Sequence, residues 1–163
     1  MGGYRPSRMP VPATSTTAVA LSPAELRAWR GMLRVHSRLV KALDAQLEED
    51  HGLPLTSYEV LLRVADADGE RMRMCDLADS ILLSRSGLTR LVDRLERDGL
   101  LARVACDDDA RGAFATLTPA GRRKLDASRA THLDGVRSMF LDHFSDEELA
   151  TLGRLWDRLD VDP

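Results

Sequence analysis

One face of a predicted helix carries side chains that can contact DNA. The stretch 85–98 follows Ser84, whose hydroxyl is suited to accept a hydrogen bond from the first helical turn. Short hydroxyl side chains and guanidinium groups share this face: Ser84, Arg85, Ser86, Thr89, Arg90 and Arg94. Such groups can reach base edges in the major groove or nearby phosphates. For this helix taken alone, an ordinary solvated face of mixed charge is the competing interpretation.

The elements around this helix favour contact with DNA. Its other face is an apolar stripe of Leu88, Leu91, Val92 and Leu95. The short helix before it carries apolar residues at three- and four-residue spacing: Leu77, Ala78, Ile81 and Leu82. Gly99 ends the second helix, and two extended segments joined by an acidic loop follow over about 101–117. A helix, a turn, a capped helix and a hairpin in this order predict a winged helix-turn-helix.

The charge pattern limits how this module can bind DNA. The whole chain has a net charge of -3, and residues 84–111 contain six arginines and six acidic residues. Phosphate binding favours a basic surface. The arginines must therefore be separated in space from the acids, or the acids must be paired with arginines. We expect marked salt sensitivity and modest non-specific binding.

Helices and a strand are predicted before the module. Residues 22–25 form a capping box with proline at the first helical position, and the amphipathic helix that they start runs to about Asp50. Residues 56–59 form a second capping box, for a mainly buried helix that Gly69 closes. The alternating residues 71–74 predict a short strand that pairs with the hairpin.

Two more apolar-faced helices are predicted after the module. Thr118 and Pro119 start a helix that runs to about His143, and the capping box 145–148 starts a last helix whose stripe continues to Leu159. One small winged helix cannot cover all of these stripes. We therefore predict a homodimer in which the terminal helices of two subunits interleave. A bundle within one chain is the alternative.

Together these features predict a mainly α (α+β) fold. The expected organisation is a disordered arm over 1–20, a dimerisation helix over 21–53, a winged helix-turn-helix over 54–118 and C-terminal dimerisation helices over 119–163. A two-fold dimer would place two recognition helices on successive turns of one face of double-stranded DNA.

The chain resembles the MarR family of bacterial transcription regulators. Three segments carry the resemblance: LSRSGLTRLVDRL at 83–95, DDDARG at 107–112 and LTPAG at 117–121. The match extends from about Ser22 to Leu159. The resemblance implies a homodimer that binds palindromic promoter DNA, usually as a repressor that a small molecule or oxidation releases.

The resemblance also assigns roles to single residues. It places Ser86, Thr89 and Arg90 at the major groove, and Arg85 and Arg94 at phosphates. Arg111 matches a wing arginine that enters the minor groove, where a narrow groove has a strong negative potential. Asp109 is expected to orient the wing by pairing with an arginine. Asp107 and Asp108 depart from the more basic loop that is common there, which weakens the expected wing contact.

A small-molecule effector is expected between the dimerisation helices and the DNA-binding lobe, as in the family. Trp29 and His36 lie on the first long helix. An aromatic ring beside cationic groups could hold a planar aromatic or anionic effector. Packing of Trp29 in the dimer core is the alternative.

Other classes of function find less support. The four histidines lack metal-ligand spacing, and no catalytic motif is present, so we expect neither a metal, a cofactor nor an enzyme. Cys75 at a helix start leaves a thiol-based redox-sensing regulator as an alternative, and Cys106 near the wing could be oxidised incidentally. A second alternative is a winged-helix protein-interaction module without sequence-specific DNA binding. The two cysteines and the lack of a secretory signal or membrane span predict a cytoplasmic protein.

Overall fold

The computed structural model of the protein describes residues 20–81, 83–106 and 109–159, and of residues 106 and 109–111 it describes the backbone only. The arm predicted over residues 1–20 therefore lies outside the described residues, apart from Ala20. The chain forms two compact units, residues 1–34 and residues 35–163.

The long first helix begins at the predicted capping box. Helix α1 spans Pro23–His51, so its first part belongs to the first unit and the rest to the second. The Ser22 N–H donates to Glu25 Oε2 at 2.7 Å, and the Glu25 N–H donates to Ser22 Oγ at 3.3 Å. These reciprocal bonds satisfy backbone donors that a helix start otherwise leaves free.

The second capping box is wrong. Helix α2 spans Leu55–Asp66 and begins after Pro54, without a side-chain cap from Thr56. The N–H groups of Ser57 and Tyr58 both donate to the Pro54 carbonyl, which starts the helix two residues earlier than predicted. The free Leu55 N–H instead donates to Asp44 Oδ1 of α1 at 2.8 Å. A carboxylate from another helix thus takes the place of the local cap.

The predicted helix-turn-helix is present. Helix α3 spans Met74–Ser80 and α4 spans Arg85–Arg97. Ser84 caps α4 by accepting a 3.1 Å hydrogen bond from the Gly87 N–H. The predicted stripe is buried: Leu88, Leu91, Val92 and Leu95. Ile81, which the spacing placed on the first helix, lies just beyond α3 in extended backbone.

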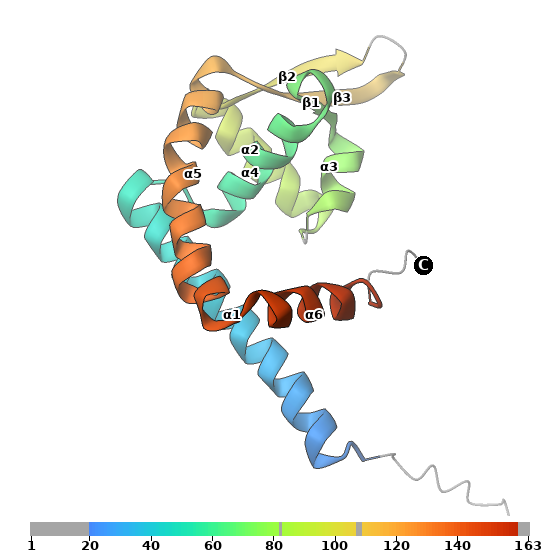
Figure 1. Ribbon diagram of the computed structural model, residues 1–163. Helices are drawn as coiled ribbons and strands as arrows, with labels where there is room; N and C mark the ends of the chain where they lie inside the picture. The colour runs from blue at the N-terminus through green and yellow to red at the C-terminus, as the bar shows by residue number, and fades with distance from the viewer. Residues whose placement is uncertain (1–19, 82, 107–108, 160–163) are drawn as a thin grey trace, which may run out of the picture. The chain divides into compact units, whose positions relative to one another are not determined.

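A small antiparallel sheet completes the winged helix (Figure 1). Its strands are β1 (Arg71–Arg73), β2 (Leu101–Cys106) and β3 (Asp109–Leu117), in the order β1-β3-β2. The predicted pairing of residues 71–73 with the hairpin is therefore confirmed. One turn of 3-10 helix, η1 (Asp68–Glu70), joins α2 to β1.

Three helical segments follow the sheet: α5 (Pro119–Met139), η2 (Leu141–His143) and α6 (Asp146–Trp156). Thr118 caps α5, and Ser145 and Glu148 form the predicted capping box of α6. Helix α5 ends at Met139 instead of His143, and α6 ends before Leu159. The order and type of these elements agree with the predicted mainly helical winged-helix fold.

The core of the second unit is formed by α1, α2, α3, α4, α5 and the hairpin strands β2 and β3. Its largest fully buried side chains include Leu47 of α1, Tyr58 and Leu61 of α2, Leu77 of α3, Leu88 of α4 and Leu125 of α5. Apolar side chains also remain exposed on α6 and just after it, among them Leu155, Trp156 and Leu159. Among the described residues, none of the helices has both the length and the apolar character needed to cross a membrane.

Candidate nucleic-acid interface and adjoining cavity

Helix α4 presents most of the predicted DNA-contacting residues on one exposed surface. The side chains of this surface are Ser84, Arg85, Ser86, Thr89 and Arg90. The Ser84 and Ser86 hydroxyls lie 3.3 Å apart, and the Thr89 hydroxyl donates to the Arg85 carbonyl at 2.9 Å. The guanidinium groups of Arg85 and Arg90 have no ion-pair partner within the described part of the chain. They are therefore available to bases or phosphates.

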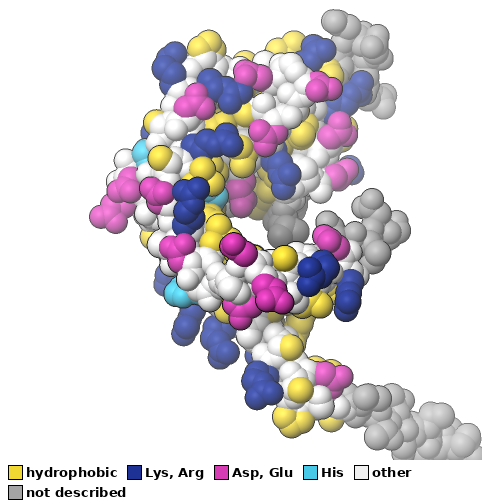
Figure 2. All heavy atoms as spheres, in the orientation of Figure 1, with side chains coloured by type: hydrophobic (Ala, Val, Ile, Leu, Met, Phe, Trp, Pro, Cys, Tyr) yellow, Lys and Arg dark blue, Asp and Glu magenta, His cyan; other side chains and the backbone are white. Residues whose placement is uncertain are grey.

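The acidic residues of α4 are paired with an arginine that sequence reasoning missed. Arg103 of β2 places Nη1 2.5 Å from Asp93 Oδ1 and 3.3 Å from Glu96 Oε2. Figure 2 shows basic and acidic side chains interspersed over the second unit, with no large area of one sign on the face in view. Pairing of acids with arginines is one of the two arrangements that the equal charge counts allowed. No local spacing indicates this pair, because it depends on how β2 lies against α4.

Arg94 also makes a contact away from the exposed surface of α4. Its Nη2 donates to the buried Ser57 hydroxyl of α2 at 3.0 Å, and its side chain lines a cavity. The structure therefore links this residue of α4 to α2. Contact between Arg94 and a phosphate remains a prediction.

The predicted wing is the hairpin of β2 and β3. The side chains of Arg111, Asp109 and Cys106 lie outside the described residues, so the roles predicted for them remain predictions. The backbone register pairs Ala105 with Ala113 but Cys106 with Asp109. The register therefore shifts in the part of β3 between these two pairs, and Arg111 lies in that part.

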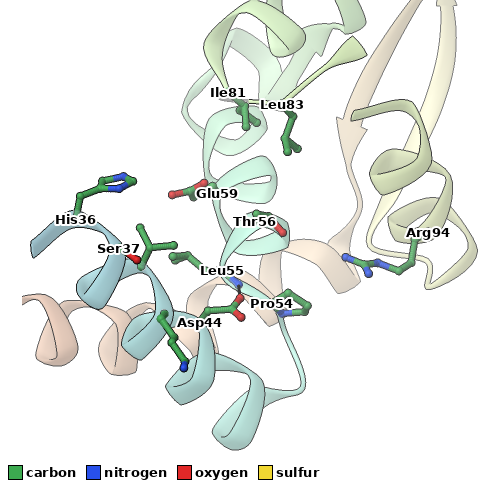
Figure 3. A pocket seen from close by; sticks show the side chains of 12 residues that line it. His36, Ser37, Asp44, Pro54, Leu55, Thr56, Glu59, Ile81, Leu83 and Arg94 are labelled. Carbon is green, nitrogen blue, oxygen red and sulfur yellow. Dashed lines mark hydrogen bonds between the residues drawn. The ribbon is translucent and has the colours of Figure 1, made fainter. Parts of the chain in front are cut away.

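A cavity of about 680 Å³ adjoins the helix-turn-helix within the second unit. Figure 3 shows its walls, which come from α1, the start of α2, the segment before α4, and α4 itself. The lining residues are His36, Ser37, Val40, Lys41, Asp44, Pro54, Leu55, Thr56, Glu59, Ile81, Leu83 and Arg94. His36, which the sequence indicated as an effector residue, is one of them. Trp29 belongs to the first unit, where its side chain is 53% exposed.

The polar groups of the cavity differ in how far they are already engaged. Asp44 accepts from Leu55 and Arg94 donates to Ser57, as described above. The His36 ring and the Glu59 carboxyl point toward one another across the cavity (Figure 3). Burial raises the pKa of Glu59, and the charge of Arg63 one turn later partly opposes this. A ligand here would meet apolar walls together with groups of both charge signs.

Asp44→Ala should lower the free energy of unfolding by about 1 kcal/mol, because it leaves the Leu55 N–H at the start of α2 without its acceptor. Urea unfolding would measure the change. Asp44→Asn retains an acceptor oxygen and should recover part of the loss. Glu48→Ala removes an exposed carboxylate from the same helix and should have little effect. Equal losses in the Asp44→Ala and Glu48→Ala variants would contradict the capping role.

His132 of α5 packs against Tyr58 of α2, with ring centroids 4.5 Å apart. Its Nδ1 is buried and lacks a hydrogen-bond partner among the described residues. Burial lowers the pKa of His132, because an imidazolium ion loses hydration there. The unfolded chain, with an imidazole pKa of about 6.5, therefore binds the proton more readily than the folded protein.

It follows that the contribution of His132 to stability is fully present above about pH 6.5 and decreases as the pH falls through that value. His132→Phe keeps a ring beside Tyr58 but cannot be protonated. Its free energy of unfolding should fall less than that of the wild type between about pH 7.5 and pH 5.5. His143→Gln changes an exposed histidine and should keep the wild-type slope. Identical slopes for His132→Phe and the wild type would refute this assignment.

Among the described residues there is no group of three or more His, Cys, Asp or Glu side chains that could hold a metal ion. Cys75 is exposed, and its thiol lies 3.3 Å from Asp76 Oδ1. His51 Nε2 forms a 2.8 Å hydrogen bond with the Thr131 hydroxyl.

Comparisons with known proteins agree with this geometry. A model of the MarR family matches residues 51–112. The HTH-type transcriptional repressor YetL of Bacillus subtilis (strain 168) is 30% identical over 114 residues, which make up 68% of this chain and 68% of that protein. The crystal structure of AbsC, a MarR family transcriptional regulator from Streptomyces coelicolor, is 34% identical with a TM-score of 0.81, and the match covers 86% of this chain and 94% of AbsC.

A second MarR family regulator from Streptomyces coelicolor, solved in complex with DNA, is also 34% identical, with a TM-score of 0.82. That match covers 86% of this chain and 91% of the other. These relatives are transcription regulators, not enzymes. In fold and in sequence, this chain belongs to the MarR family of transcription regulators.

Proposed function

We propose that this regulator binds palindromic promoter DNA as a homodimer, with α4 in the major groove and the β2–β3 hairpin in the minor groove. The exposed surface of α4 carries the proposal, because Arg85 and Arg90 stand there without ion-pair partners among the described residues. The relative solved with DNA supports it at 34% identity. Ser84, Ser86 and Thr89 contribute hydroxyl groups to the same contact.

The wing, formed by the β2–β3 hairpin, completes the contact of each subunit with its half of the palindrome. Arg111 enters the minor groove, where its guanidinium group meets the negative potential of a narrow groove. Asp109 orients it. Arg94 reaches a phosphate once α4 docks, at the cost of its hydrogen bond to Ser57.

Dimerisation rests on the apolar side chains that one chain leaves exposed. Leu155, Trp156 and Leu159 are exposed near the C-terminus, as are Trp29 and Leu33 of the first unit. Apolar surface of this kind is removed from water when two copies associate. Residues 21–53 and 119–163 thus form the dimerisation region, and residues 54–118 form the DNA-binding region. Such a two-fold dimer would match the two-fold symmetry of a palindromic operator.

A small molecule in the cavity releases the protein from DNA. The cavity touches both α1, which belongs to the dimerisation region, and the segments that hold α4. A ligand that fits only one arrangement of these elements shifts the population away from the spacing that DNA requires. Val40, Leu55 and Ile81 suit a planar aromatic body, while Lys41 and Arg94 suit an anionic group. We propose that the protein represses transcription, as the name of YetL states for that relative. We also propose that it is located in the cytoplasm.

A gel-shift titration of the protein against the DNA upstream of its own gene tests the DNA-binding proposal. A specific shift that weakens steeply with added salt is expected, because binding to phosphates releases counterions. Light scattering should give the mass of a dimer at the same protein concentration. A dimer that shifts no DNA even at low salt would favour a protein-interaction module instead.

A further inference from the structure

The recognition helix carries acidic side chains close to the residues proposed to contact DNA. Asp93 lies three residues after Arg90 and four after Thr89, so it projects from the same side of α4. The side chains of Asp93 and Glu96 are 46% and 40% exposed. Unpaired carboxylates at this position would repel the phosphates of a docked duplex. The helix therefore needs a device that neutralises them.

Arg103, on the neighbouring strand, pairs with both carboxylates and offsets one of their two negative charges. Its Nη1 contacts Asp93 Oδ1 at 2.5 Å and Glu96 Oε2 at 3.3 Å. Its Nη2 donates to the Thr89 carbonyl at 3.4 Å. Hydrogen bonds that link charged groups in this way are stronger than those between neutral groups.

The backbone of Arg103 takes part in the same cluster. Its N–H donates to Glu96 Oε1 at 3.2 Å, so one carboxylate binds both the backbone and the side chain of this residue. Strand β2 lies at the edge of the sheet, where N–H groups that face outward lack a strand partner. Glu96 thus holds the edge of the wing against α4.

The side chain of Arg103 is 28% exposed, less than either of its acidic partners. Its guanidinium group already has three acceptors on α4. We infer that Arg103 is a positioning residue whose pairing with Asp93 and Glu96 reduces their repulsion of DNA and joins the recognition helix to the wing. This role rests on the proposed binding of DNA.

Arg103→Gln should weaken binding of the upstream duplex by about tenfold, since each of two subunits then exposes two unpaired carboxylates to phosphates. Added salt should narrow the difference, because it screens exposed charges. The triple variant Asp93→Asn, Glu96→Asn, Arg103→Gln removes these carboxylates and should bind within about threefold of the wild type. Fluorescence anisotropy with a labelled upstream duplex would measure each affinity, and circular dichroism would check folding.

Arg122→Gln is the matched control, because Arg122 is paired with Glu70 and Asp126 but has no ion pair with α4. Its affinity should equal that of the wild type. The inference is overturned if Arg103→Gln binds DNA as tightly as the wild type. It is also overturned if the triple variant binds DNA as weakly as Arg103→Gln, because Arg103 would then act by contacting DNA itself or only by maintaining the fold.

A second variant keeps the test decisive if Arg103→Gln does not fold. Asp93→Asn with Glu96→Asn, in a chain that retains Arg103, should bind as tightly as the wild type or more tightly, because it removes two negative charges and retains the positive charge of Arg103. Binding about tenfold weaker would overturn the inference. If the wild type does not bind the duplex, the proposed function is refuted. If the wild type binds the duplex but the triple variant does not recover affinity, only the role of Arg103 is refuted.

Discussion

Arg90→Ala should reduce operator affinity by about a hundredfold or more while the protein remains a dimer. An arginine that forms a bidentate contact with a base contributes about 1–3 kcal/mol, and a two-fold complex loses the contact twice. The side chain is exposed and has no ion-pair partner among the described residues, so its truncation should leave the fold intact. Anisotropy titrations and light scattering on the same sample would measure both properties.

Arg137→Ala provides the matched control for charge. Arg137 lies near the end of α5, and its only ion pair among the described residues is an exposed one with Asp134. This variant removes the same charge and should bind DNA as the wild type does. Arg111→Ala tests the wing in the same assay and should also lose affinity without loss of the dimer. Full affinity in both Arg90→Ala and Arg111→Ala would refute the proposed contact surface.

Gly121→Ala should lower the free energy of unfolding by about 3 kcal/mol, the upper end of what overpacking usually costs. A Cβ atom at this position would lie 2.0 Å from the Leu100 carbonyl oxygen and 2.9 Å from Leu117 Cδ1. The first of these neighbours is backbone and cannot rotate away. Thr118 also donates to the Leu100 carbonyl, so the start of α5 is held tightly against the base of the wing. Urea unfolding would measure the loss.

Gly153→Ala is the control for helical glycine. Gly153 lies in α6, and a Cβ atom there would have no heavy atom within 4 Å. Alanine loses less conformational freedom on folding than glycine, so this variant should gain about 0.5–1 kcal/mol. Opposite signs for the two changes in the free energy of unfolding would show that the loss in Gly121→Ala comes from packing. A stable Gly121→Ala variant would mean that α5 can move away from Leu100 at little cost.

Helix starts were predicted well where the cap is local. The caps at Ser22, Ser84, Thr118 and Ser145 each use a side chain that bonds a backbone group three residues away. Such bonds need no distant partner, so residue type and spacing suffice. The buried stripe of α4 followed in the same way, because helical periodicity alone puts Leu88, Leu91, Val92 and Leu95 on one side.

Side-chain contacts with partners that are distant along the chain were not predicted from the sequence. The cap of α2 comes from Asp44, eleven residues before Leu55, and it replaced the local capping box expected at Thr56. Arg94 binds Ser57, 37 residues away. No spacing rule predicts such pairs, because their geometry is set when the helices pack.

By itself, the sequence determined the order of the helices and strands and the exposed arginine-bearing face of α4, because periodicity and capping act within a few residues. Only the tertiary structure decided how the equal numbers of acids and arginines are arranged. It put Arg103 against Asp93 and Glu96, left Arg90 unpaired among the described residues, and closed a cavity between α1, α2 and the segment before α4. The physical reason is that charge pairing and cavity walls depend on distances between elements, which the packing of the core sets.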